Sequence, residues 1–175
     1  MSGRTPTLRR RAIAALLDLP IIVAWIAFTT VLGSVLASLG ASPASPEGWD
    51  AYAFMTLILP TALTFAVADA SPRQGSWGKR RQRLQVVDRR GRRITFARSL
   101  LRQTAKLGPW QMAHTAVFQL FAGSTSGLLW VLALSPQVLV LASAAMVLFL
   151  RPPRALHDLV AQTRVIDRLG DSDDA

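Results

Sequence analysis

The feature that most constrains the fold is an uncharged and strongly apolar run of 21 residues, from Leu19 to Leu39. An α-helix rises about 1.5 Å per residue, so this run is long enough to cross the ~30 Å hydrocarbon core of a bilayer. A basic collar at residues 9–11 and a single acid, Asp18, precede it. The run exceeds the apolar core of a secretory signal peptide, so we expect a retained membrane span and not a cleaved leader.

Three further segments are apolar enough to be considered as spans. Together with the first, they predict crossings at about residues 11–37, 51–69, 102–122 and 128–150. We expect the second span to bend at Pro60, because proline removes one helical hydrogen bond. The third is the shortest and is expected to cross only if two basic residues near its start turn outward to the interface, namely Arg102 and Lys106.

The third segment also carries a polar stripe at helical spacing. Such a stripe requires a protein or water neighbour instead of lipid. Within it, a histidine could titrate near neutral pH, although hydrogen bonding to a neighbouring helix is the simpler expectation. The stripe consists of Gln111, His114, Thr115 and Gln119.

The distribution of the 20 lysines and arginines indicates the topology. The N-terminal segment holds four, residues 71–106 hold twelve, and the chain after residue 150 holds four, whereas the segments 40–50 and 123–127 hold none. By the positive-inside tendency, both termini and the loop 71–106 lie in the cytoplasm. The sequence therefore predicts an all-α membrane protein, a four-helix transmembrane bundle with multi-pass insertion in a plasma membrane.

The basic loop is expected to be structured. Residues 84–88 are typical of a short strand, 89–91 of a turn and 92–94 of a return strand, which would make a small cytoplasmic β-hairpin beside a helix capped by Thr95. Residues 163–166 are also β-prone and could pair with 84–87 instead. We expect one domain over residues 1–167 and a disordered acidic tail at 168–175.

Several of these features together resemble the RDD family of bacterial membrane proteins, which is named for one arginine and two aspartates. The resemblance rests on Arg11 and Asp18 in the first span, on the Gly-Ser-Trp-Gly-Lys-Arg stretch at 75–80, and on Leu-His-Asp at 156–158 followed by Thr-Arg-Val at 163–165. It implies that the named roles fall on Arg11, Asp18 and Asp158, with Arg10 as the alternative arginine. It also implies a role in transport, with sodium–proton exchange as one possibility.

The candidate residues admit structural and functional interpretations. Asp18 could form a structural ion pair with Arg11 that fixes helix register, or it could be a proton or cation site, because an acid in a low dielectric can exchange a proton for a cation. Asp158 could cap a short helix or bind a loop arginine such as Arg80 or Arg81.

The sequence leaves three classes of function, of which a membrane enzyme is the least supported. The first is a small transporter or cation/proton exchanger, favoured if Asp18 and the polar stripe share a water-accessible cavity; the second is a non-catalytic accessory or scaffold subunit of a larger membrane complex. The chain has no cysteine, and we find no metal cluster and no Ser-His-Asp set, so we expect no enzyme, no cofactor and no metal. Expected partners are anionic lipids and a homo-oligomer or larger membrane complex, and no nucleic acid.

Overall fold

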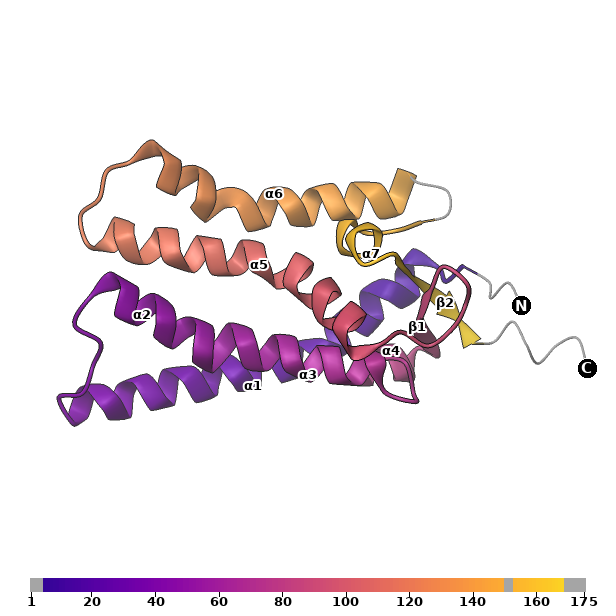
Figure 1. The fold of residues 1–175 in the computed structure, drawn as a ribbon, viewed down its shortest axis with the longest axis horizontal. Helices are drawn as coiled ribbons and strands as arrows, with labels where there is room; N and C mark the ends of the chain where they lie inside the picture. The colour runs from indigo at the N-terminus through magenta and orange to yellow at the C-terminus, as the bar shows by residue number, and fades with distance from the viewer. Residues whose placement is uncertain (1–4, 150–152, 169–175) are drawn as a thin grey trace, which may run out of the picture.

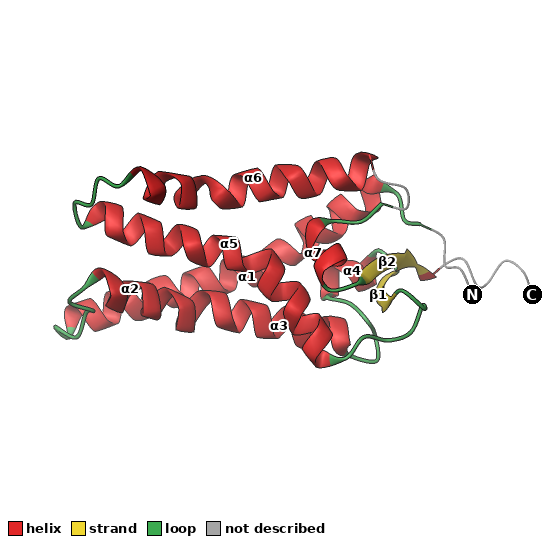
Figure 2. Ribbon diagram, turned by 45° about the horizontal axis from the view of Figure 1, so that its top comes forward, coloured by secondary structure: helices red, strands yellow, loops and turns green. Residues whose placement is uncertain are grey.

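The computed structural model describes residues 5–149 and 153–168 and is mostly helical. Four long helical rods run side by side (Figures 1 and 2). The second rod is continuous but is assembled from three segments, and the fourth follows a short turn after the third. The rods are α1 (Leu8–Ser38), then α2 (Pro46–Ala53) with the π-helix η1 (Phe54–Ile58) and α3 (Leu59–Ala70), then α5 (Phe96–Phe121), and finally α6 (Gly127–Phe149).

Three of these rods are long and apolar enough to cross a membrane: Leu8–Ser38, Pro46–Ala70 and Gly127–Phe149. Their outward faces expose large apolar side chains such as Val31 and Leu141, which suits a lipid environment. The helix α5 does not meet the same criterion of apolarity, so the predicted count of four spans is not confirmed. It lies between α6 and the α2–α3 rod and packs against both.

The predicted interruption at Pro60 takes the form of a π-helical turn, η1, immediately before the proline. Proline lacks an N–H group, so the carbonyl of Thr56, four residues earlier, loses its helical donor. Thr29 of α1 replaces that donor, because its Oγ1 donates to the Thr56 carbonyl at 3.0 Å. The proline thereby becomes a point of contact between the first two rods.

One end of the bundle carries a small polar element, which we call the cap. It contains α4 (Trp77–Arg81), β1 (Leu84–Asp88), α7 (Leu156–Val160) and β2 (Thr163–Asp167). The strands β1 and β2 pair antiparallel, with Leu84 opposite Asp167 and Asp88 opposite Thr163. The predicted pairing of residues 84–87 with 163–166 is therefore confirmed.

The predicted hairpin with a return strand at 92–94 is wrong. Only an isolated bridge joins Val87 to Arg93, with the Asp88 N–H donating to the Arg92 carbonyl, and the Val86 N–H on the same edge of β1 donates to the Gln74 carbonyl instead. Thr95 does cap α5 as predicted, its Oγ1 accepting a hydrogen bond from the Arg98 N–H. Of the predicted tail, residues 169–175 lie outside the described part of the chain, and the Arg168 N–H donates to the Arg83 carbonyl.

The core of the cap is apolar and fixes it onto the bundle. Ala14 of α1 packs with four buried side chains of the cap and the loop that follows it: Leu84, Val86, Ile94 and Val165. Arg10 adds polar contacts from the same end of α1, since it pairs with the Asp167 carboxylate and donates to the Gln82 carbonyl. The cap is thus held against the first turns of α1.

Candidate functional site

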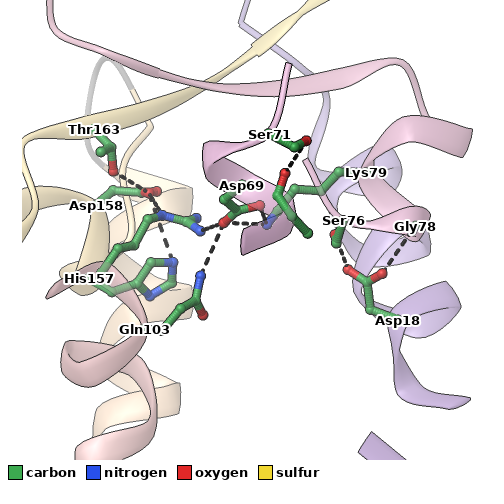
Figure 3. A network of polar contacts seen from close by, with 12 residues as sticks. Asp18, Asp69, Ser71, Ser76, Gly78, Lys79, Gln103, His157, Asp158 and Thr163 are labelled. Carbon is green, nitrogen blue, oxygen red and sulfur yellow. Dashed lines mark hydrogen bonds and ion pairs between the residues drawn. The ribbon is translucent and has the colours of Figure 1, made fainter. Parts of the chain in front are cut away.

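The centre of the site is Asp69, a fully buried carboxylate at the end of α3. Lys79 of α4 donates from Nζ to both of its oxygens, at 2.7 and 3.0 Å, and Arg102 of α5 donates from Nη1 at 2.6 Å. Gln103 adds a third donor at 3.1 Å. Asp69 therefore joins α3, α4 and α5 at one point (Figure 3).

A second carboxylate, Asp158, extends this network into α7. Arg102 donates from Nε to Asp158 Oδ1 at 2.9 Å, so one guanidinium bridges two buried acids. Thr163 Oγ1 donates to the same oxygen at 3.2 Å, and the Ala155 N–H donates to Oδ2 at 3.3 Å. The predicted capping role of Asp158 is confirmed, but its arginine partner is Arg102.

Burial and neighbouring charges shift the pKa values of several groups in this network. Burial raises the pKa of Asp158, but the Arg102 cation outweighs that effect and the net pKa is lowered to about 2. Burial lowers the pKa of the Lys79 amine, an effect that the neighbouring Asp69 opposes. For His157, burial and then the Arg102 cation lower the pKa to about 3, so its imidazole is neutral at physiological pH.

Asp18 lies at the side of this network and fastens the cap to α1. Its Oδ2 accepts a hydrogen bond from the Ser76 hydroxyl, and its Oδ1 accepts one from the Gly78 N–H at 2.8 Å (Figure 3). Gly78 permits this approach, because a Cβ at that position would lie 2.1 Å from the Ala14 carbonyl oxygen. The helix α4 can therefore rest directly on the backbone of α1.

The expected ion pair between Arg11 and Asp18 is wrong. Seven residues correspond to about 10 Å along a helix, and each side chain has nearer partners. Arg11 donates from Nη2 to the carbonyls of Pro153 and Val165, at 3.3 and 3.2 Å. Arg11 thus ties α1 to the strand β2 and to the chain before α7, whereas Asp18 ties α1 to α4.

The polar stripe of α5 lies at the opposite end of the bundle from Asp18. Asp50 of α2 accepts from Gln111 Nε2 at 2.6 Å and from Thr115 Oγ1 at 3.0 Å, and Glu47 accepts from Gln119 at 2.8 Å. The stripe therefore has the protein neighbour that was expected, but it does not converge with Asp18. His114 contacts the Trp110 carbonyl of its own helix at 2.7 Å, not a neighbouring helix.

A cavity of about 450 Å³ lies between the bundle and the cap. Asp18 and Asp158 are in its wall, as are four cationic side chains from α1, α4 and α5: Arg11, Lys79, Arg102 and Lys106. The remaining wall is largely apolar and includes Phe65 and Val147. Among residues 5–149 and 153–168, no cluster of His, Asp or Glu suitable for a metal ion is found.

Comparison with known proteins was decisive for the family. A sequence model of a protein family, described as RDD family, matches residues 5–162. This range includes every described helix of the bundle and most of the cap. The chain belongs to the RDD family. Neither the curated proteins nor the solved structures gave a match.

Membership in the RDD family, together with three helices apolar enough to cross a bilayer, identifies an integral membrane protein. Two central residues of this RDD protein were missed in the sequence. Asp69, the last residue of the second predicted span, was not among the candidate residues, and Arg102 was expected to turn outward, yet Arg102 is only 4% exposed. The signal that could have found them is their shared position at the polar ends of adjacent spans, where a charge that faces protein needs an opposite charge.

The neutral state of His157 in this RDD protein predicts acid sensitivity. An unfolded histidine titrates near 6.5, so between about pH 6.5 and 3 the unfolded state binds a proton that the folded state does not, and stability falls as pH falls. The loss is at most ~1.4 kcal/mol per pH unit. The carboxyl of Asp158, with its pKa lowered to about 2, adds a loss only below its usual value of 3.8.

We therefore expect the melting temperature of the protein in detergent to be lower at pH 5 than at pH 7. His157→Gln should flatten this dependence, and His114→Gln, which changes the other histidine, should leave it in place. An equally steep dependence in His157→Gln and in the wild type would show that another group is responsible.

Proposed function

We propose that this RDD protein is a four-span bundle of the bacterial plasma membrane, with the cap and both termini in the cytoplasm. Every described lysine and arginine lies in residues 5–11, 71–106 or 153–168, and none lies in 40–50 or 123–127, which agrees with the positive-inside tendency. The helix α5 has 26 residues, about 39 Å, and its polar stripe is satisfied by Asp50 and Glu47 of α2. Packed between α6 and α3, it needs less apolar surface than a lipid-facing helix. The basic loop would contact anionic headgroups.

We further propose that the protein is a small transporter that exchanges a cation for a proton at Asp18, and that it carries out no covalent chemistry. The observation that supports this proposal is the cavity of about 450 Å³ with Asp18 in its wall. Asp158 also lies in this wall, but it is paired with the Arg102 cation. Asp18 instead has two neutral hydrogen-bond donors and, among the described residues, no cation within 4 Å, so its charge is available to a bound ion.

The second rod adds support from the middle of the bundle. Discontinuous helices near the centre of the bilayer form the ion and substrate sites of many transporters. Here the rod stays continuous but changes to a π-helical turn at η1. The neighbourhood of η1 is hydroxyl-rich: Tyr52 donates to the Thr29 carbonyl, Thr29 donates to the Thr56 carbonyl, and the buried Thr61 Oγ1 has no partner. These groups lie between the cavity at the cap end and the polar stripe at the other end.

The test is cation-dependent proton movement in proteoliposomes that contain a trapped pH indicator. The wild type should change the internal pH when a sodium or potassium gradient is imposed, and Asp18→Asn should reduce the rate to that of protein-free liposomes. Asparagine can retain the contacts with Ser76 and Gly78, so the variant should fold. The control is Glu47→Gln, the same carboxylate-to-amide change at an exposed site, which should retain the wild-type rate.

Two outcomes would contradict exchange at Asp18. Undiminished proton movement in Asp18→Asn would remove the residue from the mechanism. No movement in the wild type, combined with a stoichiometric second protein after purification in mild detergent, would instead support the accessory-subunit alternative. That alternative draws on the buried network at Asp69, which holds the cap rigidly enough to serve as a docking element.

A further inference from the structure

The cavity at the cap end contains more positive than negative charge. Four cationic and two acidic side chains line it, and a third acid, Asp69, lies behind the wall. Lys79 and Arg102 are occupied by carboxylates, and the neutral His157 adds no charge. The two remaining cations, Arg11 and Lys106, have no carboxylate within 4 Å among the residues that the structure describes.

These two cations are available to a ligand. The Nε of Arg11 is buried and has no hydrogen-bond partner, while its Nη2 is held by the carbonyls of Pro153 and Val165. The Nζ of Lys106 lies over the Phe65 ring, 5.5 Å from its centroid, and the residue is exposed. A buried, unsatisfied guanidinium nitrogen and a free amine in one cavity form a site for an anion.

The apolar part of the wall indicates what kind of anion. Most of its residues lie on α1 and α6. Neither helix is the main packing partner of the other, since α1 packs mainly on α4 and the second rod whereas α6 packs on α5 and α7. Several lining residues on these two helices are exposed, namely Leu8, Ala12, Ala15, Ala144 and Leu148. In a bilayer, the cavity would therefore be open to acyl chains between α1 and α6.

We propose that this cavity binds one anionic phospholipid, with its phosphate at Arg11 and Lys106 and an acyl chain along the apolar wall between α1 and α6. The charge surplus selects an anion, and the small side chains of Ala12, Ala15 and Ala144 leave room for a hydrocarbon chain. The site lies at the polar end of three membrane-spanning rods, at the level of a lipid headgroup. The proposal requires insertion in the membrane, and it concerns the same cavity as the exchange proposed at Asp18, although its ligands are Arg11 and Lys106.

The test uses short-chain phosphatidylglycerol, phosphatidylcholine and inorganic phosphate, each added to the purified protein in detergent. Thermal stabilisation and lipid adducts in native mass spectrometry are the readouts. Phosphatidylglycerol should stabilise the wild type and form a single tightly held adduct, and the other two should have little effect. Lys106→Gln should weaken phosphatidylglycerol binding about fivefold, the effect of one basic residue near an anionic headgroup.

Matched variants separate this site from general charge and general folding effects. Arg90→Gln removes the same charge from an exposed position of the loop and should leave the affinity unchanged. Ala144→Trp should block the acyl path, whereas Ala142→Trp, also exposed on α6 but outside the cavity lining, should not. Asp18→Asn should still bind the lipid, so loss of exchange and loss of lipid binding are distinguishable.

The remaining outcomes would overturn the proposal. Equal stabilisation by inorganic phosphate would indicate a site for a small phosphate compound and not a lipid. Equal binding of phosphatidylcholine, or equal weakening by Lys106→Gln and Arg90→Gln, would indicate nonspecific contact with the protein surface.

Discussion

Asp69→Asn is expected to destabilise the folded protein by about 3–5 kcal/mol, the largest effect of any single charge removal that we consider. The asparagine has nearly the same shape, but it leaves the Lys79 amine and the Arg102 guanidinium in a buried site without one of their counter-charges. A stranded buried charge is more costly than the pair is favourable. Thermal unfolding in detergent, followed by circular dichroism, measures the change.

Asp50→Asn is the matched control for this experiment. Asp50 is also a partly buried carboxylate between helices, but its donors are the neutral Gln111 and Thr115, and an amide oxygen can replace it as an acceptor. We expect a loss of only ~1 kcal/mol there. Similar stabilities of Asp69→Asn and the wild type would show that the Asp69 charge is not needed to stabilise Lys79 and Arg102 in the buried network.

A double variant then tests the reason for the loss. Adding Lys79→Met to Asp69→Asn removes one stranded cation, and the flexible thioether side chain can fill its space. The double variant should be more stable than the sum of the two single changes predicts, with a coupling of about 1–3 kcal/mol. Strict additivity would mean that Lys79 and Asp69 do not stabilise each other in the fold.

The sequence predicted the elements of this protein better than their contacts. Long apolar runs are a local signal, and they indicated the helical rods. The pairing of residues 84–87 with 163–166 was also predictable, because both segments are β-prone and were expected on the same side of the membrane. The return strand at 92–94 is reduced to one bridge, because local β propensity does not reveal that the Gln74 carbonyl accepts the Val86 N–H on that edge of β1.

The contacts of the charged residues depend on how the rods pack. They join residues that are far apart in the sequence, so a short stretch of sequence does not predict them. Arg102 lies 33 residues after Asp69 and 56 before Asp158, and only the packing of α5 against α3 and α7 brings the three together. The Arg11–Asp18 pair was predicted from helical spacing alone. Helical spacing describes α1 alone, whereas Arg11 and Asp18 both find their hydrogen-bond partners on other segments of the chain.

Gly78→Ala is expected to separate α4 from α1 and thereby to lower the stability of the whole cap. The added Cβ would lie 2.1 Å from the Ala14 carbonyl oxygen and 2.9 Å from Asp18 Oδ1, and the first of these is a backbone atom that no rotamer change can move. The helices must separate, so the Gly78 N–H would also lose its bond to Asp18. Overpacking alone costs about 1–3 kcal/mol, and the lost buried hydrogen bond adds ~1 kcal/mol.

Gly108→Ala is the control for this substitution. Gly108 lies inside α5, and a Cβ there would meet no atom within 4 Å, so alanine should be neutral or stabilise the helix by up to about 1 kcal/mol. Limited proteolysis of the cap, alongside thermal unfolding, should show faster cleavage of residues 71–95 in Gly78→Ala only. If both alanine variants were equally resistant, α4 would not depend on close contact with α1, and the hydrogen bonds of Asp18 could not be what holds the cap in place.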